Sequence, residues 1–349
     1  MKVGLAIYGS LDSHSGGYLF DRMLVSRLRE RGDVVEIVSM PRRRYAANLL
    51  DNLAYRNGSD VDVLVQDELN HPSLLLANRR LHRSPIISIV HHLRSSERRP
   101  RWENAMYRLI ERGYLNSVDG FVFNSEVTRE SVQLLARRPK PFVVATPGGD
   151  RLGRSTPEHV RQRALRPGPL RLIYVGSLTP AKGLDVLIDA LAVLPRADFS
   201  LDVVGASAAA PRFAGNMRRM AEDRRLPVSF CGELDDRALE EKLRNSHVMV
   251  LPSYYEGFGI AYLEGMAHGL PALGTVAGAI PDLVSDGVDG YLVSPGDARV
   301  LADRILALGH KRKTLARLGL AALRRFDAFP TWEQTTERIR DFLLSVALR

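Results

Sequence analysis

The sequence contains a single cysteine, Cys231, so no disulfide can form within the chain. That shortage is typical of proteins from a reducing compartment. No apolar run reaches the ~18 residues of a membrane-spanning helix. The first ten residues, MKVGLAIYGS, lack the apolar core and cleavage site of a signal peptide. We therefore expect a cytoplasmic protein, whose only contact with a membrane would be peripheral, at its inner face.

Metal-binding motifs are also missing. The sequence has no HExxH and no Cys-x2-Cys, and no Asp-x-Asp follows a predicted strand in the second half. The segment DVD at 60–62 opens a predicted strand in the first half, where a solvated turn accounts for it more simply. We expect no metal ion and no cofactor.

Positive charge is in excess and unevenly distributed. The formal net charge is +9; residues 1–165 hold 26 Lys and Arg against 18 Asp and Glu, whereas 166–349 hold 23 against 22. A basic half indicates either an anionic partner or simply an arginine-rich surface. Nucleic acid lacks support as that partner, because there is no zinc finger, no RNP-like aromatic strand and no evident helix-turn-helix.

Length and hydrophobic pattern predict two α/β domains. A chain of 349 residues is long for one core, and apolar runs alternate with amphipathic stretches in both halves. The apolar runs predict strands over 2–9, 34–40, 61–66, 85–92, 119–126 and 141–149, then over 170–178, 199–205, 228–234, 247–253, 271–276 and 290–295. The amphipathic stretches predict helices over 18–31, 183–194, 212–224, 236–246, 298–308 and 331–348.

Strands that are apolar on both faces are typical of parallel sheets covered by helices. The predicted architecture is therefore two Rossmann-like, doubly wound domains facing a central cleft. We place the first domain at 1–160, with helix 331–349 returning to it, and the second at 161–330. The polar segment 153–171, rich in Arg and Pro, is predicted to be the linker.

One segment, YYEGFGIAYLEGMAHGLP at 254–271, places glycines and carboxylates between a strand and a helix. The strand ends at Pro252, and the helix is expected to run from near Gly259 to Gly269. Ligands of open α/β sheets bind at such turns. The glycines allow close approach of the backbone, and the free N–H groups at the helix start favour a phosphate.

Two acids, Glu256 and Glu264, bracket this predicted anion site. An ionised glutamate only accepts hydrogen bonds, so it suits a pair of hydroxyls. Glu256 lies in the turn, and Glu264 lies ~7 Å further along the helix by its rise per residue. Two diols on either side of a diphosphate describe a sugar nucleotide. Alternatively, Glu256 merely complements the helix dipole and Glu264 is a solvated helical residue.

The Glu-x7-Glu segment resembles the signature of the retaining glycosyltransferases of family 4, the large family similar to glycogen synthases and mannosyltransferases, which has the GT-B fold. The similarity extends to YVGSLTPAKGLDVLIDAL (174–191), VSFCGEL (228–234) and GAIPDLVSDGVDGYLVSPGD (278–297). It is detailed over most of 170–310 and looser in the N-terminal half. The resemblance implies metal-independent, retaining transfer of a hexose-type sugar from a nucleotide-diphosphate sugar to a hydroxyl of a glycan, a lipid-linked acceptor or a small molecule.

The resemblance also implies roles for individual residues. Lys182 would hold the donor diphosphate together with N–H groups at 258–260, Glu256 would orient the sugar hydroxyls, and Glu264 would hold the ribose. The family's usual arginine is replaced by Ser177, so either the donor binds more weakly or another cation supplies the second contact. The implied donor-binding residues are Gly16, Gly17, Ser177, Lys182, Glu256, Gly257, Phe258, Gly259, Ile260 and Glu264.

In the first half, Gly16 and Gly17 are expected in a loop between the first strand and the first helix, resembling the family's glycine loop near the donor phosphates. The strand at 85–92 ends in His91 and His92, whose side chains should point to opposite faces. The resemblance selects His91 as the contact to the transferred sugar. Residues 124–126 follow the next strand and are candidates for the acceptor side.

The acceptor is less defined. Residues 94–115 join arginines to apolar side chains at helical spacing, namely Trp102, Met106, Tyr107, Leu109 and Ile110. Such a helix either lies on an anionic membrane surface, as family members with lipid acceptors suggest, or packs on the sheet as an ordinary amphipathic helix. A GT-B epimerase or phosphorylase is the nearer alternative function, although no cofactor lysine and phosphate site for a phosphorylase is evident.

Overall fold

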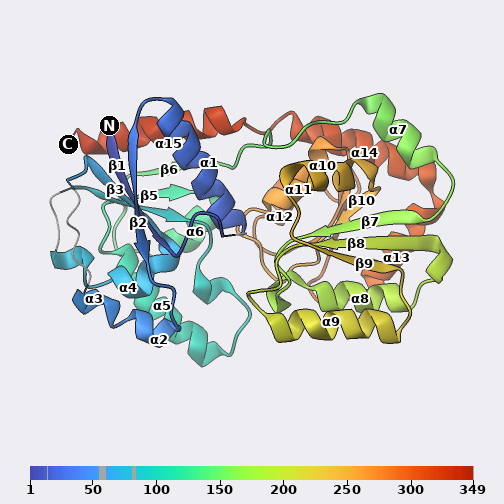
Figure 1. Cartoon of the computed structure of the whole chain (residues 1–349), viewed down its shortest axis with the longest axis horizontal. Coiled ribbons are helices and arrows are strands. Elements are labelled where there is room, and N and C mark those ends of the chain that lie inside the picture. The colour runs from blue at the N-terminus through green and yellow to red at the C-terminus, as the bar shows by residue number, and fades with distance from the viewer. Residues whose placement is uncertain (14, 55–59, 81–83, 349) are drawn as a thin grey trace. The chain divides into compact units, whose positions relative to one another are not determined.

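The computed structural model describes residues 1–13, 15–54, 60–80 and 84–348. The chain forms two compact units, the first comprising Met1–Gly148 and Pro330–Arg349 and the second Gly149–Phe329. Each unit contains one six-stranded sheet, and Figure 1 shows helices on both faces of each sheet. The predicted α/β architecture with two Rossmann-like sheets is confirmed.

The sheet of the first unit has the order β2-β1-β3-β4-β5-β6, and all its neighbouring strands are parallel. Its strands are β1 (Lys2–Tyr8), β2 (Val34–Met40), β3 (Val63–Asp67), β4 (Ile86–Val90), β5 (Gly120–Phe123) and β6 (Phe142–Val144). The chain passes from β1 to β2 on one side and returns to β3 on the other. The segments that follow β1 and β3 therefore lie at a topological switch point, where open α/β sheets bind ligands.

Seven α-helices belong to the described part of this unit: α1 (Gly16–Glu30), α2 (Tyr45–Asn48), α3 (Asp51–Ala54), α4 (His71–Leu74), α5 (Arg101–Leu115), α6 (Glu126–Leu135) and α15 (Trp332–Ala347). The last of them returns from the far end of the sequence. The Thr335 hydroxyl donates a hydrogen bond of 2.7 Å to the Thr146 carbonyl, and Arg340 donates one of 2.6 Å to Asp33. These contacts hold the C-terminal helix against the first unit.

The second sheet has the order β12-β11-β10-β7-β8-β9 and is also parallel throughout. Its strands are β7 (Leu170–Val175), β8 (Phe199–Val204), β9 (Val228–Gly232), β10 (Val248–Val250), β11 (Ala272–Thr275) and β12 (Gly290–Val293). Here β7 and β10 are neighbours, and the chain leaves them in opposite directions. The switch point therefore lies between the segments that follow these two strands.

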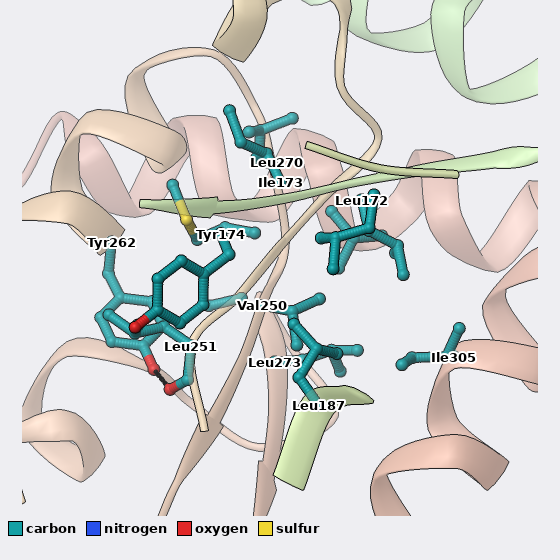
Figure 2. Packing of buried hydrophobic residues seen from close by; sticks show 14 of the residues in the cluster. Leu172, Ile173, Tyr174, Leu187, Val250, Leu251, Tyr262, Leu270, Leu273 and Ile305 are labelled. Carbon is teal, nitrogen blue, oxygen red and sulfur yellow. Dashed lines mark hydrogen bonds between the residues drawn. The ribbon is translucent and has the colours of Figure 1, made fainter. Parts of the chain in front are cut away.

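The helices of the second unit cover this sheet: α7 (Pro157–Leu165), α8 (Leu184–Ala192), α9 (Pro211–Asp223), α10 (Asp236–Asn245), α11 (Ile260–Ala267), α12 (Ile280–Leu283), α13 (Ala298–His310) and α14 (Arg312–Phe326). Figure 2 shows part of the core between strands and helices, where Leu172, Val250 and Leu273 come from three adjacent strands. Tyr262 of α11 reaches into this core and donates its hydroxyl to the Leu251 carbonyl. The base of α11 is thus fixed to the end of β10.

The prediction that 153–171 is a linker is wrong. Helix α7 occupies the middle of this segment and packs against α14, and Val160 is fully buried. The buried Arg163 guanidinium donates to three backbone carbonyls, those of Arg244, His268 and Gly269. Pro157 stands in the first helical turn, where a proline removes no hydrogen bond, so it begins a helix here instead of breaking one.

The unit boundary follows from this packing. Residues 149–160 belong to the second unit, whereas the sequence pattern placed them in the first domain. Helix α14 was not anticipated at all, although its apolar residues are buried against α11 and α7. All twelve predicted strands overlap strands of the structure. None of the described helices has both the length and the apolar character needed to cross a bilayer.

Candidate functional site

The switch point of the second unit brings Lys182 and Glu256 together. Lys182 ends a short 3₁₀ turn after β7, and Glu256 lies in the segment after β10. The Lys182 Nζ lies 2.6 Å from Glu256 Oε1. The Tyr254 N–H donates to the Ala181 carbonyl at 2.9 Å, which joins the two segments through their backbones. The pair therefore rests on the two central strands of the sheet.

Glycines make this close approach possible. Gly183 follows Lys182 with a φ of +67°, and a Cβ there would lie 2.1 Å from the Pro252 carbonyl oxygen. Gly278 has a φ of +66°, and a Cβ there would lie 2.0 Å from the Glu256 carbonyl oxygen. A side chain at either position would push apart the segments that carry the ion pair.

The Glu256 carboxylate is held from two sides. Only 7% of the residue is exposed, and its Oε1 accepts both the Lys182 ammonium and the Ser253 hydroxyl, the latter at 2.8 Å. The Ala279 N–H donates to the Glu256 carbonyl at 2.9 Å. A carboxylate fixed in this way can orient hydroxyl groups, because it only accepts hydrogen bonds.

The N-terminus of α11 follows directly. Gly259 stands at the N-cap with a φ of +99° and offers no side-chain cap, and no acidic residue stands in the first turn. Those N–H groups and the helix dipole favour an anion. Phe258 is buried and packs edge-on against Phe329, with ring centroids 6.2 Å apart, so only its backbone is left for a ligand. Ile260 is half-buried as the first residue of the helix.

Glu264 is paired with an arginine that sequence reasoning missed. Its Oε1 accepts from Arg151 Nε at 2.9 Å and from Nη2 at 2.5 Å, and Arg151 Nη1 also contacts Asp236. Burial raises the pKa of Glu264, and the Arg151 charge opposes that rise. Of the two Glu264 oxygens, Oε2 receives no hydrogen bond from the described residues.

Ser177 replaces the expected arginine in the turn after β7. Its carbonyl accepts from the Thr179 N–H at 2.9 Å and from the Tyr174 hydroxyl at 3.3 Å. The residue therefore shapes the turn that leads to Lys182. Arg151 is a cation of the same unit with a side chain 13% exposed, but it is already paired with Glu264 and Asp236.

The switch point of the first unit gathers a histidine and two acids. His91 follows β4, Asp67 ends β3 and Asp21 belongs to α1. The His91 Nε2 lies 3.4 Å from Asp21 Oδ1, and one ligand atom from each of the three residues lies within 4.8 Å of the others. Asp21 Oδ2 is buried and has no hydrogen-bond partner among the described residues.

The glycine loop predicted around Gly16 and Gly17 is wrong, since both residues form the first turn of α1. The Ser15 hydroxyl accepts from the Tyr18 N–H and caps the helix, which offsets the poor helix propensity of glycine. Gly17 has a packing role, because a Cβ there would lie 3.0 Å from the His91 ring. Residue 14, also part of the predicted loop, lies outside the described residues.

The acids set the electrostatics of His91. Burial by itself would lower the pKa of this imidazole, but the hydrogen bond and charge of Asp21 and the charge of Asp67 raise it. Burial and the Asp21 charge raise the pKa of Asp67 to about 7. This part of the first unit can therefore hold a proton or a cation between carboxylates.

The two adjacent histidines have different surroundings, as their strand spacing predicts. The side chain of His91 is 14% exposed and that of His92 is 41% exposed, with His92 Nε2 at 3.2 Å from Glu97 Oε1. The Asn124 amide donates to the His91 carbonyl at 2.9 Å and so orients the end of β4. Asn124 thus supports the backbone here.

The chain is similar to proteins of a known family. Residues 155–325, which lie wholly in the second unit, match the model of the family described as glycosyl transferases group 1. A D-inositol 3-phosphate glycosyltransferase of Actinosynnema mirum is 30% identical over 254 residues, which are 68% of this chain and 60% of that protein. The chain belongs to the group 1 glycosyl transferases.

Another relative of this group 1 glycosyl transferase is named for the transfer of a sulfoquinovosyl group. The sulfoquinovosyl transferase SQD2 of Arabidopsis thaliana is 28% identical over 180 residues, 51% of this chain and 34% of SQD2. The alignments thus span 60% and 34% of the lengths of these two relatives.

Solved structures identify the fold as GT-B. Sucrose-phosphate synthase from Thermosynechococcus elongatus gives a TM-score of 0.82 at 20% identity, covering 99% of this chain and 98% of its own. HepE from Anabaena, solved in complex with UDP-glucose, gives 0.80 at 18% identity, covering 99% and 100%. The GT-B fold that the family resemblance implied is therefore confirmed.

Three polar residues of this group 1 glycosyl transferase were not found from the sequence: Arg151, Asp21 and Asp67. Arg151 is 113 positions from Glu264, and Asp21 is 70 positions from His91. Asp67 ends an apolar strand, where a polar residue is a signal for the site edge. The described residues offer two sets with metal-ligand spacing, Asp21–Asp67–His91 and a deeper set in the same unit.

Proposed function

We propose that the protein is a retaining glycosyltransferase that moves a hexose-type sugar from a nucleoside-diphosphate sugar to an acceptor hydroxyl. The observation that carries the proposal is the Lys182–Glu256 pair, 2.6 Å apart at the switch point and beside the N-terminus of α11. The Lys182 ammonium and the N-terminus of α11 would bind the diphosphate, and the Glu256 carboxylate would accept hydrogen bonds from the sugar hydroxyls.

Donor binding would exchange partners at this pair. The diphosphate takes the Lys182 ammonium and the N–H groups at 258–260, and the Glu256 oxygens turn to the sugar hydroxyls. A lysine can hold a phosphate as a point charge. Its ammonium and the helix dipole also stabilise charge on the departing diphosphate without a divalent ion.

Glu264 is the proposed ribose contact. Arg151 occupies Oε1, so Oε2 is the oxygen available to a ribose hydroxyl. The bidentate Arg151 contact fixes the carboxylate plane, which orients that acceptor. The UDP-glucose complex of HepE supports a nucleotide sugar as donor, because that protein shares the fold.

His91 is the proposed contact to the sugar near its reacting carbon, with Asp21 behind it. We assign no side-chain nucleophile. In the family the acceptor attacks on the face from which the diphosphate leaves, and the diphosphate helps to take the acceptor proton.

The test begins with a calorimetric screen of UDP, GDP, ADP and TDP sugars against the purified chain. One class should bind, and NMR of the product should show the anomeric configuration of the donor retained. Nucleotide release that depends on an added acceptor supports transfer. Release without acceptor, or a donor sugar returned with inverted stereochemistry at another carbon, would indicate an epimerase or phosphorylase instead.

We also propose that α5 rests on an anionic membrane surface. Trp102, Met106 and Leu109 are exposed along one face of the helix, whereas Tyr107 is buried. The exposed arginines of this helix are Arg101, Arg108 and Arg112. A basic helix with an apolar outer face suits an anionic lipid interface.

Flotation with liposomes tests this proposal. Vesicles with anionic lipid should carry the protein and neutral vesicles should not, and a Trp102→Ser/Leu109→Ser variant should lose most of the binding. Equal flotation of the variant would contradict it.

A further inference from the structure

A second cluster of ionisable side chains lies deep in the first unit. Glu68 follows β3, His71 begins α4 and Glu111 lies on α5. All three residues are at most 3% exposed. One carboxylate oxygen of each glutamate and one ring nitrogen of His71 lie within 4.8 Å of one another. Two carboxylates in so dry a place require compensating positive charge.

Hydrogen bonds from the protein do not fully satisfy these two carboxylates. Glu111 accepts from the Ser95 N–H through Oε1, but Glu111 Oε2 has no hydrogen-bond partner among the described residues, and Glu68 Oε1 faces only the His71 Nδ1, at 3.0 Å. The nearby Ser73 shows the contrast, because its hydroxyl contacts the Tyr8 hydroxyl at 2.6 Å and donates to Asp51 at 3.0 Å. Ser73 is thus satisfied, whereas the neighbouring Glu111 carboxylate is not.

The ring of His71 is already oriented as a ligand. Its Nε2 lies 2.8 Å from the Tyr45 hydroxyl, while Nδ1 lies 3.0 Å from both Glu68 Oε1 and the Glu68 carbonyl oxygen. Metal-bound histidines use their second ring nitrogen in this way, to hold the ring in place. A proton on Nδ1 can form hydrogen bonds with the two Glu68 oxygens, but Glu111 Oε2 then receives no hydrogen bond.

The arginine that lies over Tyr45, the tyrosine in contact with His71, is engaged by aromatic rings. Arg94 lies over the rings of Tyr45 and Tyr107, at 5.1 and 4.8 Å from their centroids. Within the part of the chain that the structure describes, no ion pair joins Arg94 to Glu68 or Glu111. Among the residues that the structure describes, His71 is the only cationic side chain that pairs with these carboxylates.

We propose that Glu68, His71 and Glu111 bind one divalent transition-metal ion, Zn²⁺ or Mn²⁺. Imidazole with two carboxylates suits these ions. Bonds of ~2.1 Å place ligand atoms roughly 3–4 Å apart, so ligand atoms that lie up to 4.8 Å apart must approach by about 1–2 Å to close the site. The ion links the segment after β3 to α5, which makes it structural, and sugar transfer does not pass through it.

The first measurement uses the full chain after EDTA treatment and desalting. Addition of Zn²⁺ or Mn²⁺ should raise the midpoint of thermal unfolding by about 5 °C at saturating metal. After a second desalting, elemental analysis should find about one ion per chain. Added Mg²⁺ is the control ion and should give neither effect. Absence of both effects with Zn²⁺ and Mn²⁺ overturns the proposal.

Variants then locate the ion. Glu111→Gln keeps an acceptor for the Ser95 N–H but removes a ligand charge; it should lose the bound metal and the thermal shift. Glu103→Gln, on the same helix, is the matched control and should retain both. A metal-free gain in stability of Glu111→Gln is expected from relief of repulsion, so metal retention is the decisive readout. Metal bound equally by Glu111→Gln and His71→Gln overturns the site.

Co²⁺ substitution gives an independent readout on the unmodified chain. Co²⁺ in a low-coordinate site with nitrogen and oxygen ligands should give visible absorption that His71→Gln lacks. The same spectrum in Asp67→Asn, which alters the neighbouring Asp21–Asp67–His91 set, supports the deeper cluster; loss of the spectrum only in Asp67→Asn assigns the ion to that neighbouring set and overturns the proposal. Donor binding is measured separately, so failure of this inference leaves the transferase assignment untouched.

Discussion

The two sheets are built alike, yet their switch points carry opposite electrostatic arrangements. In the second unit both acids of the candidate site have a cation, Glu256 with Lys182 and Glu264 with Arg151. In the first unit, Asp21 and Asp67 stand together with only His91 between them. The net charges of the two sequence halves would instead suggest that cations neutralise the acids of the first unit, because the excess of Lys and Arg lies in the first half. Surface composition therefore does not report the charge of a site.

The histidines reflect the same difference. Carboxylates raise the pKa of His91 in the first unit. In the second unit, burial and the arginines Arg171, Arg312 and Arg163 lower the pKa of His247 to about 3. One unit is thus arranged to hold positive charge on its histidine and the other to exclude it.

The largest expected effect comes from the paired acid at the second switch point. Glu256→Ala should reduce kcat/KM by at least ~10³-fold, because it removes the proposed contact to the sugar hydroxyls and frees Lys182. The fold should persist, as shown by an unchanged circular dichroism spectrum. Glu222→Gln, an exposed acid of the same unit, is the control. A fully active Glu256→Ala enzyme would contradict the proposal that Glu256 contacts the donor sugar.

Next in size is the Arg151–Glu264 pair. Arg151→Met leaves Glu264 buried without its cation and should cost about 3 kcal/mol of unfolding free energy. Urea unfolding of the second unit measures this loss. Arg151→Met combined with Glu264→Leu should recover most of it. If the double variant is no better than the single one, the loss comes from packing and the contrast between the units weakens.

The pH dependence of His247 is a smaller effect of defined sign. The Arg171 N–H donates to its Nδ1 at 2.9 Å and its Nε2 faces the Arg163 carbonyl at 3.0 Å, so the folded state holds the neutral ring. The unfolded chain protonates near pH 6.5, so stability present above that pH is lost as pH falls from about 6.5 toward 3, by up to ~1.4 kcal/mol per pH unit.

Urea unfolding at pH 7 and pH 5 measures this slope. His247→Asn should flatten it, and His310→Asn, at an exposed histidine, should not. An equally steep slope in His247→Asn would assign the effect to other groups.

The smallest effect concerns Asp21 as a positioning residue. Asp21→Asn should lower kcat about 10-fold while the donor KM changes less than about two-fold, since it acts through His91. Glu30→Gln on the same helix is the control. In a His91→Ala background the Asp21 change should have no further effect; an additive loss would show that Asp21 acts independently of the histidine.

Local sequence patterns predicted most of the fold and indicated several residues of the candidate site. The twelve strands were recognisable because strands buried on both faces must be apolar along their length. Lys182, Glu256 and Glu264 were recognisable because each lies within or beside a short motif after a strand. Helix α7 was missed because a proline at its start and a polar sequence imitate a linker, and Gly16 and Gly17 were misplaced because Ser15 capping outweighs glycine's poor helix propensity.

Partners that are distant in the chain could not be foreseen. Nothing near Glu264 indicates Arg151, and nothing near Glu68 and His71 indicates Glu111. The order of apolar and polar residues along the chain settled the two sheets and the position of the segments that carry Lys182 and Glu256, since burial of a strand depends on its own side chains. Which acids receive a cation, and which remain crowded, was settled by packing alone, because Coulomb interactions depend on distance in space.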